Sequence, residues 1–174
     1  MTIMVAYASE HGSTKAIAER IANNLSSHGL NAKSSPVEKL DDLSAYKYLV
    51  VGSAVHAMHW LPAAKQFLLQ HRTYLTTIPV WAFSVGYPDG LPKIFGGGEG
   101  HVGEEEKKLA HHIGEMAVPR EHKLFSGALR KEDLGRAFSW MYGVFGGHFG
   151  ENTDFKKIDE WADQIAKHIK DAGN

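Results

Sequence analysis

Hydroxyl side chains and a glycine gather in one short loop near the start of the chain. The loop comprises Ser9, Glu10, His11, Gly12, Ser13 and Thr14. It lies between an apolar run and a helical pattern, so the free N–H groups of a helix N-terminus should join its three hydroxyls. One hydroxyl is enough to cap a helix, and three around a glycine exceed that need. The loop therefore predicts a phosphate-binding site.

The same loop lacks the signatures of two common phosphate sites. It contains no GxxxxGK[ST] run, which nucleoside triphosphate sites with Mg²⁺ use. It also contains no GxGxxG run, which disfavours a nicotinamide dinucleotide. The expected ligand therefore belongs to neither of these classes.

Two later loops combine open backbone with an imidazole or an aromatic ring. The first holds Ser53, Ala54, Val55 and His56, and the second holds Ser84, Val85, Gly86 and Tyr87. Main-chain hydrogen bonds and stacking in such loops can hold a flat heterocycle. Trp60, just after the first loop, fits a stacking partner and a core residue equally well.

The elements that must position these loops alternate along the chain. Short apolar runs predict strands over 3–8, 30–35, 48–51, 80–85 and 123–129. Helical patterns begin at Thr14, run from Leu61 to Leu75, and begin again at Glu104 and Phe155, with a loop predicted over 86–103. Five βα units predict one α/β domain, a doubly wound five-stranded parallel sheet with helices on both faces. The three loops would then meet at the carboxyl edge of the sheet.

One segment, residues 130–154, does not fit the alternation. It carries Leu134, Phe138, Met141 and Phe145 at helical spacing and is rich in other aromatic residues. We interpret it as a helical insertion before the last helix. Its apolar surface fits packing on the sheet, or contact with a quinone-bearing membrane surface, a partner protein or a second copy of the chain.

The phosphate loop, with Val5-Ala6-Tyr7-Ala8 before it, resembles the (S/T)xxGxT loop of flavodoxins. The whole chain looks like the flavodoxin branch that includes menaquinone-dependent protoporphyrinogen oxidase. This closer resemblance is carried by three runs: Gly52-Ser53-Ala54-Val55, Ser126-Gly127-Ala128-Leu129-Arg130, and Gly146-Gly147 with Thr153-Asp154. His56 stands where that oxidase has an arginine.

The resemblance implies that the chain binds FMN. Ser9, His11, Gly12, Ser13 and Thr14 would hold the phosphate, while 53–56 and 84–87 would flank the isoalloxazine. With one phosphate loop and no adenosine-binding unit, we expect FMN rather than FAD.

Three classes of function remain open. An FMN-dependent oxidoreductase would pass electrons from a small substrate to a quinone or another acceptor, as in the protoporphyrinogen oxidase branch. A flavodoxin-type carrier would shuttle electrons between proteins, and a non-redox relative would have lost the flavin. Carriers are usually strongly acidic, and the formal net charge of −1 favours the enzyme.

Composition removes several other classes. The chain has no cysteine, which excludes disulfides, thiolate nucleophiles and Cys-ligated iron–sulfur clusters. The balanced charge disfavours nucleic acid. Neither the histidine pair at His56 and His59 nor the adjacent His111 and His112 matches a known zinc pattern, so we expect no metal site. Without a signal peptide or a run of about 20 apolar residues, the expected location is the cytoplasm.

Overall fold

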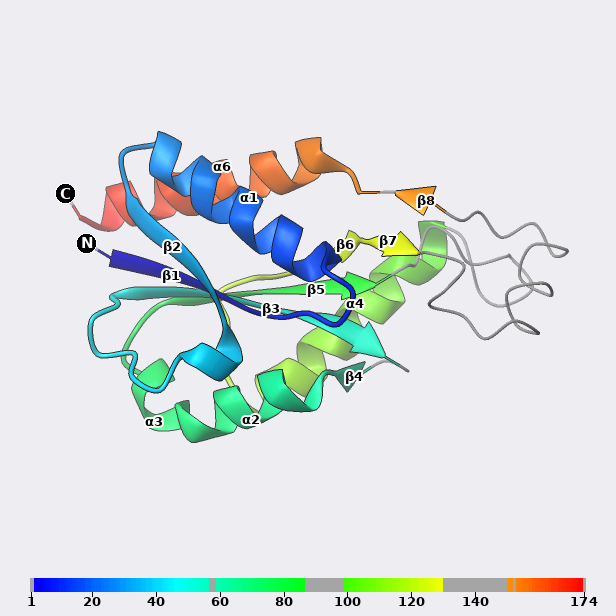
Figure 1. Ribbon diagram of the computed structural model, residues 1–174, viewed down its shortest axis with the longest axis horizontal. Helices are drawn as coiled ribbons and strands as arrows, with labels where there is room; N and C mark the ends of the chain where they lie inside the picture. The colour runs from blue at the N-terminus through cyan, green and yellow to red at the C-terminus, as the bar shows by residue number, and fades with distance from the viewer. Residues whose placement is uncertain (1, 57–58, 87–98, 130–149, 152, 174) are drawn as a thin grey trace, which may run out of the picture.

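A computed structural model describes residues 2–56, 59–86, 99–129, 150–151 and 153–173. Tyr87 and most of the predicted insertion at 130–154 lie outside these residues, so the expectations about them stay predictions. The described part of the chain forms a layered α/β structure with a parallel sheet between helices (Figure 1).

Five parallel strands form the main sheet. They are β1 (Thr2–Ala8), β2 (Asn31–Pro36), β3 (Tyr48–His56), β5 (Val80–Gly86) and β6 (His122–Ser126). Their order is β2-β1-β3-β5-β6, which is the doubly wound arrangement with its switch point between β1 and β3. This confirms the predicted fold class. A short addition, β4 (His59–Trp60), pairs antiparallel with the end of β3.

The helices cover both faces of the sheet (Figure 1). They are α1 (Ser13–Ser27), α2 (Pro62–Gln70), α3 (Arg72–Leu75), α4 (Glu99–Gly114) and α6 (Phe155–Ala172), with a 3-10 turn at Val37–Lys39. Helices α1 and α6 pack on one face, whereas α2, α3 and α4 pack on the other. Within the described residues, no helix is both long enough and apolar enough to cross a membrane.

Strand β1 explains why the central strands appear as continuous apolar runs. Its side chains alternate between the two cores: Ile3, Val5 and Tyr7 face α1 and α6, and the residues between them face α2 and α4. A strand covered on both faces has no solvent side, so every position favours an apolar residue.

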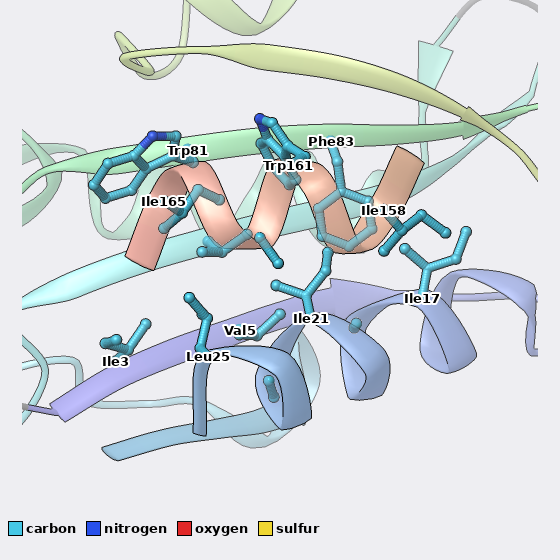
Figure 2. Close-up of a cluster of buried hydrophobic side chains, with 14 of the residues drawn as sticks. Ile3, Val5, Ile17, Ile21, Leu25, Trp81, Phe83, Ile158, Trp161 and Ile165 are labelled. Atoms are coloured by element: carbon cyan, nitrogen blue, oxygen red, sulfur yellow. The ribbon is translucent and has the colours of Figure 1, made fainter. Parts of the chain in front are cut away.

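Aromatic rings fill the core beneath α6 (Figure 2). The ring centroids of Phe83 and Trp161 lie 6.2 Å apart in an edge-on arrangement, and Phe125 lies 5.6 Å from Trp161. Offset and edge-on pairs of this kind add to the free energy gained by burial. The three rings connect β5, β6 and α6.

Helix α1 ends at a glycine. Gly29 follows the helix with φ of +79°, a conformation that glycine adopts without strain. The N–H of Leu30 donates to the carbonyl of Leu25, and the N–H of Gly29 donates to that of Ser26. This pair of hydrogen bonds is the Schellman motif, and it directs the chain into β2.

Strand β3 runs to His56, whereas the sequence predicted its end at Val51, so residues 53–56 belong to a strand and not to a loop. Three further predicted boundaries were wrong. Helix α4 begins at Glu99 rather than Glu104, inside the stretch predicted as loop, because packing of Leu109 and Ile113 on the sheet outweighs the low helix propensity of the nearby glycines. The helix expected from Leu61 to Leu75 divides at His71 into α2 and α3.

The third boundary concerns the fifth strand. The apolar run at 123–129 forms two strands, because the chain leaves the parallel sheet at Gly127. Beyond it, β7 (Ala128–Leu129) pairs antiparallel with β8 (Gly150–Glu151) in a separate two-stranded sheet. The expected single strand is therefore a parallel strand followed by an antiparallel one.

Gly52 gives a direct test of the β3–β5 packing. It lies opposite Phe83, and a Cβ atom added to Gly52 would overlap the Phe83 ring. We expect Gly52→Ala to lower the free energy of unfolding by about 2–3 kcal/mol, because the buried ring would have to shift. Urea unfolding followed by circular dichroism measures the change.

Gly114→Ala is the matched control, because a Cβ there meets nothing within 4 Å. Its stability should stay within about 0.5 kcal/mol of the wild type. Equal stability of the Gly52 variant and this control would contradict the packing described for Phe83.

Candidate cofactor-binding site

The β1–α1 loop has the backbone geometry of an anion site. Gly12 precedes α1 with φ of +94°, and its N–H donates to Ser9 Oγ at 3.1 Å. Its own carbonyl accepts from the N–H of Ala16 at 3.0 Å, which starts the helix. Gly12 offers no side chain to cap α1, so the N–H groups of the first turn are left to an external acceptor.

Thr14 carries the most informative polar atom of this loop. The residue is 1% exposed, and its Oγ1 has no hydrogen-bond partner among the described residues. A buried hydroxyl without a partner costs free energy, so its presence needs an explanation, and a ligand that completes the site is one. The oxyanion of a phosphate is an acceptor that would fit this hydroxyl together with the helix N–H groups.

The carboxyl ends of β1, β3, β5 and β6 lie at one edge of the sheet (Figure 1). Ala8 pairs with Ser53, and Ser53 pairs with Ser84. The structure therefore brings the described residues of the three predicted loops to one edge, although 53–56 and 84–86 are the ends of β3 and β5 and not loops. Of the candidate residues there, Ala54, Val55 and Gly86 are half-buried, Val85 is buried and His56 is exposed.

Ser53 and Ser84 are fully buried and already bonded. Ser53 Oγ donates to the carbonyl of Ala54 at 2.8 Å and accepts from the N–H of Leu61 at 3.0 Å. These bonds fold the chain from β3 into α2. The two serine side chains thus stabilise the carboxyl ends of β3 and β5 from inside the protein.

Trp60 lies in the core on the side of α2 and α4 and is 3% exposed. Its indole N–H donates to Ser84 Oγ at 2.7 Å. Almost no surface of the ring is left for stacking on a ligand, so this structure favours the core interpretation of Trp60. Through its bond to Ser84, the Trp60 ring connects the segment that follows β3 to β5.

His122 extends this network to β6. Its Nε2 lies 2.8 Å from Ser84 Oγ. An indole can only donate, so Ser84 accepts from Trp60 and can use its own hydrogen for the His122 nitrogen. Burial, with a smaller contribution from the charge of Lys123, lowers the pKa of His122 to about 4. The neutral imidazole therefore belongs to the folded state near pH 7. The residue types alone did not suggest this role.

Gly127 brings the end of β6 against the phosphate loop. Its N–H donates to the carbonyl of Gly86 at 2.7 Å. A Cβ atom there would lie 2.8 Å from Val85 Cγ1 and 3.3 Å from Ser13 Oγ. Only glycine fits this close approach without moving its neighbours. Gly127 was noticed in the sequence for its family resemblance and not as a site residue.

Glu10 and His56 join the first two loops at the surface. His56 Nε2 lies 2.6 Å from Glu10 Oε2, and the side chains are 63% and 48% exposed. An exposed pair of this kind contributes at most about 1 kcal/mol to stability. It does show that the end of β3 and the phosphate loop lie within side-chain reach.

A separate hollow of about 530 Å³ lies at the opposite, amino edge of the sheet. Its lining includes Arg72, Ile78, Met116, Val118 and Arg120, most of them exposed. None of the predicted site residues lines it. The chemistry described above belongs to the carboxyl edge; residues 87–98, which follow β5, lie outside the described residues.

The low pKa of His122 predicts a pH dependence of stability. The unfolded chain binds a proton at His122 near pH 6.5, whereas the folded chain binds it only near pH 4. Stability from this group is therefore full above pH 6.5 and falls by about 3 kcal/mol as the pH drops to 4. Urea unfolding at several pH values should show a smaller loss for His122→Asn than for the wild type.

His168→Asn is the control for this experiment, because His168 is exposed on α6. It should keep the wild-type dependence on pH. If the His122 and His168 variants lose the same stability between pH 6.5 and 4, the buried network does not hold His122 neutral.

Comparison with known proteins agrees with this geometry. A family model described as "Flavodoxin domain" matches residues 4–138. No sequence among the curated proteins matches. Solved structures that resemble the chain include a flavodoxin from the domain Archaea, with 19% identity, 98% of this chain and 99% of that chain covered, and a TM-score of 0.57.

Two further structures are similar. Oxidised flavodoxin 2 from Bacillus cereus has 20% identity and a TM-score of 0.58, with 98% of this chain matching 99% of that chain. Rubredoxin oxygen:oxidoreductase from Desulfovibrio gigas has 18% identity and a TM-score of 0.60, with 97% of this chain matching 36% of that longer one. At these identities the structures support the fold. Because the family model covers most of the chain, the protein belongs to the flavodoxin domain family and binds FMN, as predicted.

Proposed function

We propose that the protein is an FMN-dependent oxidoreductase that takes electrons from a small substrate and passes them to a quinone or another acceptor. The observation that carries this proposal is the charge of the chain. It has 19 Lys and Arg against 20 Asp and Glu, a formal net charge of −1. Proteins that dock on many basic partners need a strong opposite field, and this chain has none.

In this proposal, the β1–α1 loop binds the FMN phosphate. Thr14 Oγ1 supplies a hydrogen bond from a buried position that otherwise lacks a partner. The first-turn N–H groups of α1 and the hydroxyl of Ser13 complete the set of donors. Ser9 acts mainly by holding Gly12 in its turn. Backbone groups then carry most of the binding, without a required cationic side chain.

The isoalloxazine would lie at the carboxyl ends of β3 and β5. The side chains of Ser53 and Ser84 are used inside the protein, so residues 54–56 and 85–86 at the ends of these strands would flank the ring. Flavin accepts one or two electrons, and its two-electron reduction also takes up protons. His56 is exposed at the end of β3 on this side.

The family resemblance also bears on the identity of the substrate and the acceptor. The resemblance to the protoporphyrinogen oxidase branch favours a porphyrinogen as the electron donor and a menaquinone-type acceptor. The departure at His56 makes the β3 loop the place where this chain would differ in substrate preference. An arginine is always charged, whereas an imidazole is neutral above its pKa.

A flavodoxin-type carrier is the second candidate. Similar structures of nearly the same length are flavodoxins, and the similar oxidoreductase is a longer protein. In the carrier, electrons would pass through the exposed edge of FMN to partner proteins. The low net charge is the observation that speaks against this candidate.

Steady-state kinetics separates the two candidates. We expect catalytic turnover when the FMN-loaded protein is given a porphyrinogen or NAD(P)H together with a menaquinone analogue. A carrier would instead show no turnover with any such pair, but rapid oxidation by a protein acceptor at a rate that falls with salt. The second result would replace the enzyme with the carrier.

Thr14→Val tests the phosphate contact. Valine has the shape of threonine without the hydroxyl, so we expect FMN affinity to fall by about 2 kcal/mol, since the lost hydrogen bond is to a charged group. The stability of the FMN-free protein should stay equal or rise, because the hydroxyl has no partner there. Fluorescence titration of FMN and urea unfolding measure the two effects.

Two controls accompany this variant. Thr14→Ser keeps the hydroxyl and should retain more affinity than Thr14→Val. Thr73→Val alters an exposed residue of α3 on the other side of the molecule and should leave FMN binding unchanged. Wild-type affinity in Thr14→Val would mean that the phosphate lies elsewhere.

A further inference from the structure

Two loops at the carboxyl edge bring together three side chains that commonly bind metal ions. Glu10 and His11 follow β1, and His56 ends β3. Strands β1 and β3 are parallel neighbours, with Ala8 paired to Ser53, so the chain leaves both strands at nearly the same place. One ligand atom from each of the three side chains lies within 4.8 Å of the others.

We propose that Glu10, His11 and His56 form a binding site for one divalent transition-metal ion of the Zn²⁺ type. One carboxylate oxygen and two imidazole nitrogens are a donor set that suits Zn²⁺ and its neighbours in the first transition row. All three side chains are exposed, which leaves further coordination positions open to water and gives the ion a path of entry.

The geometry needs only small changes to accept the ion. Zinc–nitrogen bonds near 2.0–2.1 Å in a tetrahedral site hold the ligand atoms about 3.3 Å apart. Glu10 Oε2 and His56 Nε2 are 2.6 Å apart, so they must separate slightly, and His11 must stay or move closer. Side chains this exposed can change rotamer without disturbing the core.

An ordinary surface ion pair is the competing explanation for Glu10 and His56. Such a pair needs only one histidine and one carboxylate. The chain contains an example of it: His28 Nε2 lies 2.8 Å from Asp163 Oδ1. Among the described residues, the grouping at Glu10, His11 and His56 is the one that adds a third ligand. His28 therefore provides a matched control of the same chemistry.

The inference differs from the sequence-based expectation of no metal site. That expectation compared His56 with its sequence neighbour His59. The structure instead joins His56 to a loop far away in the sequence. The proposed site does not rest on the proposed function, since the three ligands come from the protein alone.

The test uses the untagged chain of 174 residues at measured FMN content, after dialysis against a chelator. Isothermal titration with Zn²⁺ should give one site per chain, and Co²⁺ should give the visible absorption of a four- or five-coordinate ion. We expect Glu10→Gln and His56→Asn each to weaken Zn²⁺ binding at least about tenfold. His28→Asn should bind as the wild type does.

Three results would overturn the proposal. The first is the absence of saturable Zn²⁺ binding in the wild type. The second is binding that survives both Glu10→Gln and His56→Asn. The third is an equal loss in His28→Asn, which would show unspecific binding by surface histidines. Circular dichroism should be unchanged in all three variants, and the free energy of unfolding should stay within about 1 kcal/mol of the wild type, because the altered side chains form only exposed ion pairs.

Discussion

The contact between Phe83 and Gly52 is the constraint on which the sheet and its site depend. The Phe83 ring occupies the space that a side chain at position 52 would take. The ring also packs against Trp161 (Figure 2) and Phe125, so a single side chain connects β3, β5, β6 and α6. Interiors this closely packed leave little freedom, and the pairing of β3 with β5 cannot slip without losing the contact.

This pairing decides where the next residues along both strands lie. Ser53 and Ser84 follow Gly52 and Phe83 directly, and they are register partners at the carboxyl edge. Buried hydroxyls there divide into two groups. Those of Ser53 and Ser84 bond inside the protein, whereas Thr14 Oγ1 has no partner among the described residues. The difference separates groups that shape the site from one that is available to a ligand.

The sheet was largely predictable from the sequence because its central strands are buried on both faces. Continuous apolar runs, as in β1, and the glycine that ends α1 are strong local signals. Boundaries were less predictable. Gly127 interrupts an apolar run because of its approach to Val85 and Ser13, which is a tertiary contact that no local pattern reveals. The same holds for the start of α4, where packing outweighs propensity.

The candidate site was predictable as a set of loops, and its internal connections were not. The phosphate loop has a local pattern and was found in the sequence. The bonds from Trp60 through Ser84 to His122, and the approach of Glu10 to His56, join residues that lie far apart along the chain. Such contacts follow from strand order, so they can be identified only once the sheet is built.

The small sheet of β7 and β8 has a consequence for how this fold can diversify. It holds the chain at 128–129 beside the chain at 150–151, outside the parallel sheet. Asp154 then caps α6 by accepting hydrogen bonds from the N–H groups of Lys156 and Lys157. The start of the last helix is therefore fixed locally and does not depend on the segment between β7 and β8. The entropy of closing a loop grows slowly with its length. Segments of different length and chemistry could therefore be exchanged between these two strands during evolution, while the core and the FMN edge stay the same.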